Sequence, residues 1–344
     1  MSSFIPIILT SPKEKPEDQK LDLTLRPKSF NDFIGQDKIK NNLLILLEAA
    51  KRRQEPPEHL LFYGSAGLGK TTLAYLIAEY LDAKIRITAG PSIERAGDLA
   101  AILTSLQAGE ILFIDECHRL NKVIEEILYP AMEDYKLDII IGKGPGARIM
   151  RLDLAPFTLV GATTRIGLIS SPLRSRFGAT YHLDFYNDQD IQTIIKRSAQ
   201  ILNTQITEQG CQTIAKCSRH TPRVANRLLK RVRDYAQVKA DGQITPTLAK
   251  TALTMLEIDH LGLEPIDRKI LHALITKFKG GPAGIQALSA ITNEEPDTIE
   301  DVHEPYLLQL GFIQRTPQGR VATHLAYKHL GIDYHEGLGQ RGLV

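Results

Sequence analysis

The chain has 344 residues, of which 43% are hydrophobic and 24% are charged. This composition is typical of a globular protein that buries a sizeable core, and the length corresponds to about two or three domains, which excludes a disordered or low-complexity protein. Forty-two basic and 40 acidic residues give a net charge of +2, so no overall basic field indicates a polyanion partner.

The cysteines and the apolar runs indicate in which cellular compartment the protein is found. Cys117, Cys211 and Cys217 cannot form a complete set of disulfides and have no metal-ligand spacing, which favours a reducing environment. No apolar run approaches the roughly 18 residues that a membrane span needs, and the apolar start of the chain does not fit a signal peptide. We therefore expect a cytoplasmic protein with no membrane partner.

Residues 1–20 are polar after Leu9 and predict a flexible tail. Between residues 21 and 186, short apolar runs at 59–63, 85–87, 111–114 and 157–160 alternate with stretches of helical periodicity. This alternation predicts an α/β domain with a parallel sheet and flanking helices. Residues 136–154 contain two apolar stretches around a glycine-rich turn, and we expect a β-hairpin inserted into this domain.

The rest of the chain predicts two smaller domains. Residues 187–257 contain only helically spaced apolar residues, which predicts a small all-helical domain. Residues 258–344 predict helices at 266–278, 285–291 and about 296–310, followed by a hairpin whose turn is 316–319. Three short helices and a terminal hairpin are typical of a winged helix, which suggests DNA binding.

Residues 64–71 (GSAGLGKT) fit the P-loop pattern, G-x-x-x-x-G-K-[ST], between an expected strand and an expected helix. In such a loop the backbone N–H groups and the helix N-terminus bind phosphate oxygens. Lys70 then reaches the β- and γ-phosphates, and the Thr71 hydroxyl binds Mg²⁺. The alternative, a strand–turn–helix without a nucleotide, is disfavoured because motif and context agree. We therefore expect ATP and Mg²⁺ as cofactors.

An acidic pair, Asp115-Glu116, follows the apolar run at 111–114. In a parallel sheet the carboxyl end of this strand lies beside the P-loop, so Asp115 is expected to hold Mg²⁺ through water. Glu116 is expected to orient and polarise the attacking water. Taken alone, such a pair more often belongs to a solvated loop. For the nearby His118 we expect a packing or interface role and no part in catalysis.

This combination resembles the AAA+ ATPases and, more narrowly, the RuvB family of Holliday-junction branch-migration motors. The resemblance runs from about residue 21 to about residue 331. It is carried by residues 115–120 (DECHRL), 161–165 (GATTR), 171–178 (SPLRSRFG) and 221–227 (TPRVANR). It implies an ATP-hydrolysing hexameric ring that moves Holliday junctions in recombination and repair.

The resemblance also implies residue roles. Thr164 matches the sensor-1 residue, Arg223 matches the sensor-2 arginine, and Arg176 matches the arginine given to the neighbouring subunit's nucleotide, with Arg174 as the rival candidate. The positions that match nucleotide-binding residues of the family are Leu25, Arg26, Gly67, Gly69, Lys70, Thr71, Thr72, Glu133, Asp134, Tyr135, Arg176, Tyr186 and Arg223. The alternative for any one arginine is a surface ion pair. An arginine supplied by a neighbour makes hydrolysis depend on ring assembly.

Partner surfaces follow from the last domain and the inserted hairpin. Residues 258–344 carry 8 basic and 11 acidic residues, so broad electrostatic attraction to DNA is not expected there. Arg315 and Arg320 flank the wing turn and match DNA-contacting positions of the family; alternatively, they only solubilise a hairpin edge. The 136–154 hairpin matches the docking site for a RuvA-like junction-binding protein, or it packs only on itself. A RuvC-like resolvase is a further possible partner of this family.

Three functions remain open from the sequence. The expected one is an ATP-driven motor that moves Holliday junctions on duplex DNA. The first alternative is a nucleotide-gated DNA-binding regulator or loader without sustained translocation, which would share the P-loop and the winged helix. The second is a scaffold that binds ATP structurally, which the intact Asp115-Glu116 pair disfavours.

Overall fold

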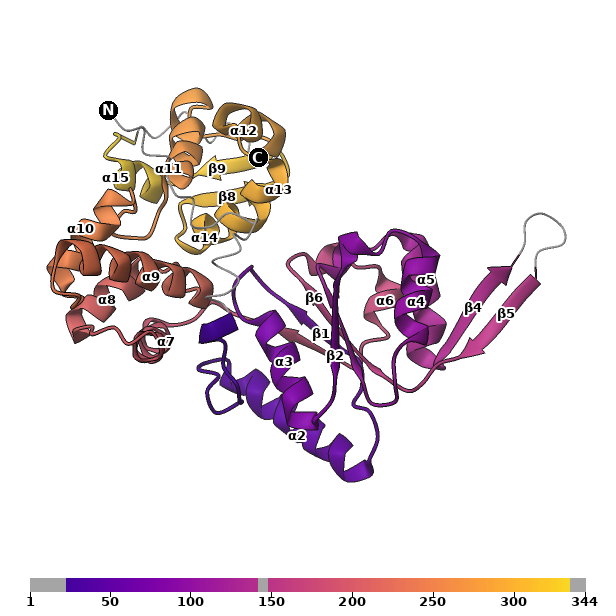
Figure 1. Ribbon diagram of the computed structural model, residues 1–344. Helices are drawn as coiled ribbons and strands as arrows, with labels where there is room; N and C mark the ends of the chain where they lie inside the picture. The colour runs from indigo at the N-terminus through magenta and orange to yellow at the C-terminus, as the bar shows by residue number, and fades with distance from the viewer. Residues whose placement is uncertain (1–22, 142–147, 335–344) are drawn as a thin grey trace. The chain divides into compact units, whose positions relative to one another are not determined.

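The computed structural model describes residues 23–141 and 148–334, which form two compact units (Figure 1). One unit contains residues 26–64 and 68–184; the other contains residues 185–334, the described residues up to Leu25, and Ser65–Gly67. The expected tail at 1–20 and the glycine-rich hairpin turn lie outside the described residues. Each unit is described by itself.

The first unit is built on a five-stranded parallel sheet with the strand order β2-β3-β6-β1-β7. Its strands are β1 (Leu60–Tyr63), β2 (Ile85–Ala89), β3 (Ile111–Asp115), β6 (Thr158–Thr163) and β7 (Ala179–His182). The central strands β1, β3 and β6 are almost fully buried, which explains their continuous apolar runs. The predicted α/β fold is confirmed. Strand β7 was not predicted, because this edge strand alternates half-buried and exposed residues and has no apolar run.

Helices flank the sheet, with α2 and α3 on one side and α4, α5 and α6 on the other (Figure 1). Their bounds are α2 (Asp37–Arg53), α3 (Lys70–Leu81), α4 (Ala96–Thr104), α5 (Lys122–Glu133) and α6 (Ser171–Arg174), with 3₁₀ turns η1 (Gly90–Ser92), η2 (Cys117–Arg119) and η4 (Ile166–Leu168). Asn121 and Ser170 start α5 and α6, because each side chain accepts a backbone N–H of the first turn. Apolar side chains of α4, α5 and α6 pack with those of β3 and β6 in one core.

The inserted hairpin is formed by β4 (Lys136–Ile141) and β5 (Arg148–Asp153), which pair antiparallel and extend away from the sheet (Figure 1). Leu137 is buried against the domain core. Across the ribbon, Asp138 accepts two hydrogen bonds from Arg151, at 2.7 and 2.8 Å, which hold the strand register. The hairpin carries the apolar residues Ile139, Ile140, Ile141, Ile149 and Met150, of which only the Met150 side chain is described, and it is exposed.

The second unit begins with four helices that match the predicted all-helical region: α7 (Asp188–Ile201), α8 (Glu208–Lys216), α9 (Pro222–Lys239) and α10 (Pro246–Met255). Asn187, Thr207 and Thr245 cap α7, α8 and α10 through their side-chain oxygens. Pro222 and Pro246 occupy first helical positions, where a missing N–H costs nothing.

A winged helix follows, as predicted. Its elements are α11 (Pro265–His272) with the π-turn η5 (Ala273–Lys277), α12 (Ile285–Thr292), α13 (Pro296–Thr298), η6 (Ile299–His303), α14 (Glu304–Gln309), β8 (Ile313–Thr316), β9 (Gly319–Ala322) and α15 (His324–Leu330). The predicted third helix is interrupted by the π-turn η6. The two strands pair antiparallel as the wing and complete a separate apolar core.

The helical region and the winged helix are joined by a buried charged network. Arg219, which precedes α9, is fully buried and forms an ion pair with Asp267 of α11. Asp267 also bonds the Nδ1 atom of His303 at 2.7 Å, and Arg219 donates to the Gly262 carbonyl at 2.9 Å. A Cβ atom at Gly262, whose φ is +79°, would clash with the carbonyl of Cys217. This junction therefore behaves as packed core, unlike a flexible linker.

The three cysteines are unpaired and buried. Burial raises the pKa of the Cys211 and Cys217 thiols to about 11 and raises the pKa of Cys117 as well, so all three stay protonated at neutral pH.

In the described parts of the chain, no helix combines the length and the apolar character needed to cross a bilayer.

We expect Arg219→Met to destabilise the second unit by about 3–5 kcal/mol, because it leaves the Asp267 carboxylate buried without its cation. The matched control is Arg231→Met on α9: Arg231 lies 3.9 Å from a half-exposed Asp234, and losing that pair costs less than about 1 kcal/mol. Urea unfolding followed by circular dichroism, with hydrogen exchange of the α9 and α11 amides, measures both. Equal losses in the two variants would contradict the structural role of Arg219.

The loss of stability in Arg219→Met is expected to depend on pH. Burial alone raises the pKa of Asp267, but Arg219 and His303 outweigh it and hold that pKa below its usual value. The stabilisation is therefore present above pH about 4 and is lost as the pH falls further. The deficit of Arg219→Met is expected to shrink between pH 6 and pH 3.

Candidate functional site

The P-loop joins β1 to α3 in a conformation that requires glycine. Gly64, Gly67 and Gly69 have φ angles of +143°, +79° and +107°. A Cβ atom at Gly64 would lie 2.5 Å from the carbonyl oxygen of Leu183. Lys70 is the first residue of α3, and its buried ammonium group donates to the Gly64 carbonyl at 2.7 Å. The ammonium group and the N-terminus of α3 thus lie at the same loop, where a phosphate group would gain both.

Two oxygen groups suited to Mg²⁺ lie next to this loop. The Thr71 hydroxyl, in the first turn of α3, donates to Asp115 Oδ2 at 3.4 Å, and Asp115 ends β3. The other oxygen of Asp115 accepts the backbone N–H of Glu116 at 2.9 Å, which fixes the carboxylate plane. A hydroxyl and a carboxylate are hard ligands of the kind Mg²⁺ prefers, so the donor set fits this ion. Thr72 follows in the same helical turn and is half-buried.

Glu116 follows β3 in a left-handed backbone conformation, with φ 50°. Its Oε2 atom accepts a hydrogen bond from the Thr164 hydroxyl, at 3.4 Å, and lies 3.2 Å from Nδ1 of His118. Thr164 directly follows β6, the neighbour of β3 in the sheet. The predicted water-polarising carboxylate and the predicted sensor are therefore in contact. The contact with His118 was not predicted, because nothing in the local sequence shows where its ring points.

Arg176 lies in a cluster with the end of α5. Its guanidinium group pairs with Glu133 at 3.1 Å, donates to the Pro172 carbonyl at 2.7 Å and stacks on the Tyr129 ring, 4.3 Å from the centroid. Its Nε atom is buried and has no hydrogen-bond partner among the residues that the structure describes. Arg174, the rival candidate, is exposed. The structure thus places Arg176 beside Glu133, another residue with a predicted nucleotide role.

The remaining nucleotide candidates lie in both units. In the first unit, Arg26 stacks on Tyr75, with 4.1 Å between guanidinium carbon and ring centroid. Asp134 is an exposed residue at the end of α5, whereas Tyr135 packs edge-on against His59 and Phe157. Leu25, Tyr186 and Arg223 belong to the second unit, where Leu25 and Tyr186 are buried and Arg223 is in the first turn of α9.

The wing arginines are both paired with acidic residues. Arg315 and Arg320 lie opposite each other in the β8–β9 register, and both bond the carboxylate of Glu304, which is 1% exposed. Arg320 also bonds Glu300 at 2.6 Å. The Arg315 side chain remains 56% exposed, whereas that of Arg320 is 13% exposed. The two arginines are therefore not equivalent, and only Arg315 presents much of its surface to solvent.

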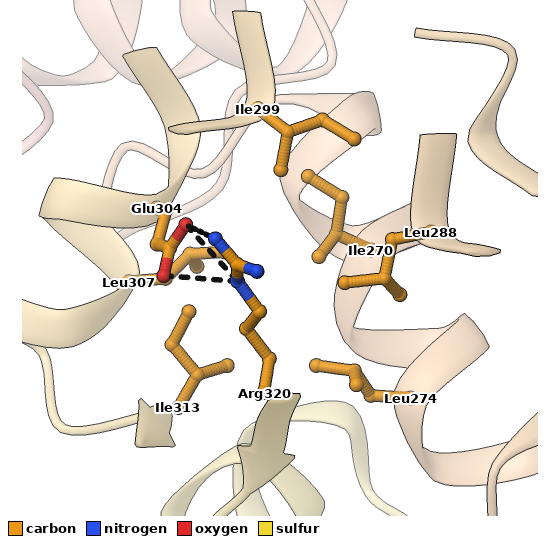
Figure 2. A pocket seen from close by; sticks show the side chains of 8 residues that line it. All are labelled: Ile270, Leu274, Leu288, Ile299, Glu304, Leu307, Ile313 and Arg320. Atoms are coloured by element: carbon orange, nitrogen blue, oxygen red, sulfur yellow. Dashed lines mark hydrogen bonds and ion pairs between the residues drawn. The ribbon is translucent and has the colours of Figure 1, made fainter. Parts of the chain in front are cut away.

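Figure 2 shows why Arg320 is enclosed. Its guanidinium group faces Glu304, and its stem passes among apolar side chains of the winged-helix core. These side chains are Ile270, Leu274, Leu288, Ile299, Leu307 and Ile313. Burial alone raises the pKa of Glu304, but hydrogen bonds from Arg315 and Arg320 outweigh it and hold that pKa below its usual value. Arg320 thus neutralises a buried carboxylate.

Comparisons with known proteins cover nearly the whole chain. The description "Holliday junction DNA helicase RuvB P-loop domain" matches residues 25–183, the RuvB AAA lid domain matches residues 186–259, and the RuvB C-terminal winged helix domain matches residues 260–331. The RuvB subunit of the Holliday junction branch migration complex from Chloroflexus aurantiacus is 56% identical over 328 residues, which is 95% of this chain and 94% of that protein. The subunit from Dehalococcoides mccartyi is 57% identical over 336 residues, 97% and 96% of the two chains.

Solved structures agree with these relatives. The Thermotoga maritima RuvB Holliday junction branch migration motor superimposes with a TM-score of 0.84 at 50% sequence identity, covering 91% of this chain and all of that one. A point mutant of the same protein gives a TM-score of 0.85 at the same identity, covering 90% and 99%. Identity above one half over nearly the full length, together with three consecutive domain matches, leaves one conclusion. The chain belongs to the RuvB family of P-loop ATPases.

Proposed function

We propose that this protein is the ATP-driven motor subunit that moves the branch point of Holliday junctions. The observation that supports this most directly is the contact of Glu116 with Thr164 beside the Thr71–Asp115 pair, on a chain that also carries a winged helix. The named relatives are branch migration subunits, and the Thermotoga maritima structure is described as a branch migration motor.

The residues of the P-loop and of the ends of β3 and β6 have different roles in ATP hydrolysis. The glycine-rich loop and Lys70 bind the β- and γ-phosphates, while Thr71 directly and Asp115 through water would hold Mg²⁺, which offsets phosphate charge when bound. Glu116 accepts a hydrogen bond from the attacking water and draws its proton as the water oxygen bonds to the γ-phosphorus, while the bond from that phosphorus to the bridging oxygen breaks and ADP leaves. Thr164 holds the carboxylate in place. Arg26 and Thr72 lie in the same unit as Lys70 and add to nucleotide binding there, and Leu25 and Tyr186 of the second unit are the further nucleotide contacts that we propose.

Arg176 acts in the nucleotide site of a neighbouring subunit. Its contacts keep the guanidinium group beside Glu133, so these two residues, with Asp134 and Tyr135, present one surface to the neighbour. The Arg176 side chain is 21% exposed, so part of it is accessible to a neighbouring subunit. An arginine that arrives at a γ-phosphate stabilises the charge of the transition state, so hydrolysis requires a ring, which we propose is a hexamer.

The second unit connects the nucleotide to DNA. Arg223 senses the γ-phosphate from the first turn of α9, four residues after Arg219. Because Arg219 pairs with Asp267, which in turn bonds His303, a rotation of the helical domain carries the winged helix with it. The moving wing presents Arg315 to the DNA backbone. With few phosphate contacts per subunit, one subunit binds weakly, and the ring gains affinity through multivalency.

The β4–β5 hairpin is the surface for the junction-binding partner. It extends from the sheet, carries the exposed Met150 and has the Asp138–Arg151 pair across its two strands (Figure 1). A RuvA-like protein of complementary apolar surface is its expected occupant, and a RuvC-like resolvase is a further partner of the assembled complex. The alternative function, a nucleotide-gated loader, would need the same ATP site but no continuous movement.

We expect ATP-dependent branch migration of a synthetic four-way junction, stimulated by the cognate junction-binding protein. Lys70→Ala loses nucleotide affinity and movement together, because the phosphate charge is no longer matched. Glu116→Gln keeps ATP binding within a few-fold but lowers turnover by about 10²–10⁴, the usual contribution of a general base. Strand separation on gels, phosphate release and nucleotide binding measure the three properties. ATP turnover without junction movement would favour the loader.

Arginine action in trans predicts complementation between two inactive variants. Arg176→Ala and Lys70→Ala proteins are each expected to be inactive, but their mixture regains part of the ATPase activity. The reason is that a Lys70→Ala subunit still offers Arg176 to a neighbour whose P-loop is intact. Arg174→Ala is the matched control and retains activity. A mixture as inactive as its components would contradict the trans role, and an inactive Arg174→Ala would move that role to Arg174.

The different burial of the wing arginines predicts different defects. Arg315→Ala weakens duplex binding and reduces the slope of log K against log salt by about 1 per subunit. It also removes one cation from Glu304, but we expect a smaller loss of stability than in Arg320→Ala, because the Arg315 side chain is 56% exposed and its charge is screened by water. Arg320→Ala lowers the stability of the winged helix, because Glu304 is left buried with one cation fewer. Salt titrations of DNA binding and urea unfolding of both variants measure this. Equal loss of stability in both would contradict the distinction.

A further inference from the structure

His118 is a buried polar residue beside the catalytic carboxylate. It lies in the single 3₁₀ turn η2 that directly follows β3 and Glu116, and its side chain is 6% exposed, against 36% for Glu116. Its Nδ1 atom is 3.2 Å from Glu116 Oε2 and 3.0 Å from the hydroxyl oxygen of Thr163, the last residue of β6. The ring therefore connects the loop after β3 to the end of β6.

The chemistry of these partners fixes the role of Nδ1. An ionised carboxylate only accepts hydrogen bonds, so the contact with Glu116 is favourable only when Nδ1 carries its hydrogen. The same N–H group has a second acceptor in the Thr163 hydroxyl, whose oxygen also receives the backbone N–H of Arg165 at 2.9 Å. His118 is thus a fixed donor between a buried hydroxyl and a more exposed carboxylate.

We propose that His118 is a positioning residue that orients the Glu116 carboxylate for its work on the attacking water; this rests on the proposed role of Glu116. Nδ1 of His118, at 3.2 Å, and the Thr164 hydroxyl, at 3.4 Å, both lie next to Oε2, and two donors there would fix the rotation of the carboxylate. The imidazole ring is fixed by its burial, whereas the Glu116 carboxylate is more exposed and has more freedom to rotate. The ring can therefore restrict the rotation of the carboxylate. His118 itself touches neither nucleotide nor water in this role.

The test uses the assembled full-length protein with junction DNA and compares His118→Leu with His118→Asn. Leucine fills the space without a donor, and kcat is expected to fall about tenfold to a hundredfold, the effect of losing one hydrogen bond to a charged group. KM for ATP stays within about twofold, because the phosphate-binding residues are untouched. Asparagine carries an N–H near the place of Nδ1–H and is expected to retain kcat within about threefold.

Two further variants separate positioning from packing. His118→Gln keeps a polar side chain but moves its donor one bond further out, so it is expected to behave like leucine even if the leucine variant folds poorly. His182→Leu replaces an exposed histidine of β7 in the same unit and is expected to leave kcat unchanged. Equal kcat in the asparagine and glutamine variants, or an unchanged kcat in leucine, would overturn the proposal.

Combining His118→Leu with Glu116→Gln separates this proposal from the function on which it rests. In single-turnover measurements the double variant is expected to be no slower than Glu116→Gln alone, because His118 acts only through that carboxylate. A further loss in the double variant would mean that His118 acts elsewhere, and the proposal would fail. If Glu116→Gln alone keeps full turnover, the proposed role of Glu116 fails first.

Discussion

The site depends on the parallel alignment of three neighbouring strands. In the sheet, β6 lies between β3 and β1, and the ladder pairs Tyr63 with Thr163 and Ile114 with Gly161. Parallel strands end at one edge, so the P-loop, Asp115 and Thr164 emerge side by side although they are far apart in sequence. The buried apolar side chains of these strands fix that register, because a slip of one residue would expose them.

The sequence predicts the residues of this edge better than it predicts their contacts. The P-loop and the acidic pair are visible because each is a local pattern beside an apolar strand. The parallel sheet, the helical region and the winged helix follow from periodicity in the same way. Strand β7 is not predicted, because its residues alternate between half-buried and exposed positions and form no apolar run. The pairs Arg176–Glu133 and His118–Glu116 are not predicted either. They depend on how the guanidinium group and the imidazole ring are oriented, which the spacing of residues in the sequence does not determine.

Charge compensation explains why counting basic residues is a poor guide to the DNA surface. The winged-helix region carries more acidic than basic residues, yet two of its acids, Glu300 and Glu304, are used internally to bind wing arginines. Their neutralisation leaves Arg315 with an exposed side chain and a fixed position. In the proposed ring, one such cation per subunit would contribute modest affinity, and several subunits together would keep the ring bound to DNA while single contacts are released.

The buried network between the helical region and the winged helix determines how the proposed motor would transmit movement to DNA. Linked domains normally move independently unless their interface is large and well packed. Here an arginine, an aspartate and a histidine are buried together, and separating them would expose charged groups to incomplete pairing. Bending at this junction is therefore costly. Under the proposed function, a nucleotide-dependent movement that starts at α9 would therefore reach the wing as rotation of one body, with little flexing between the two domains.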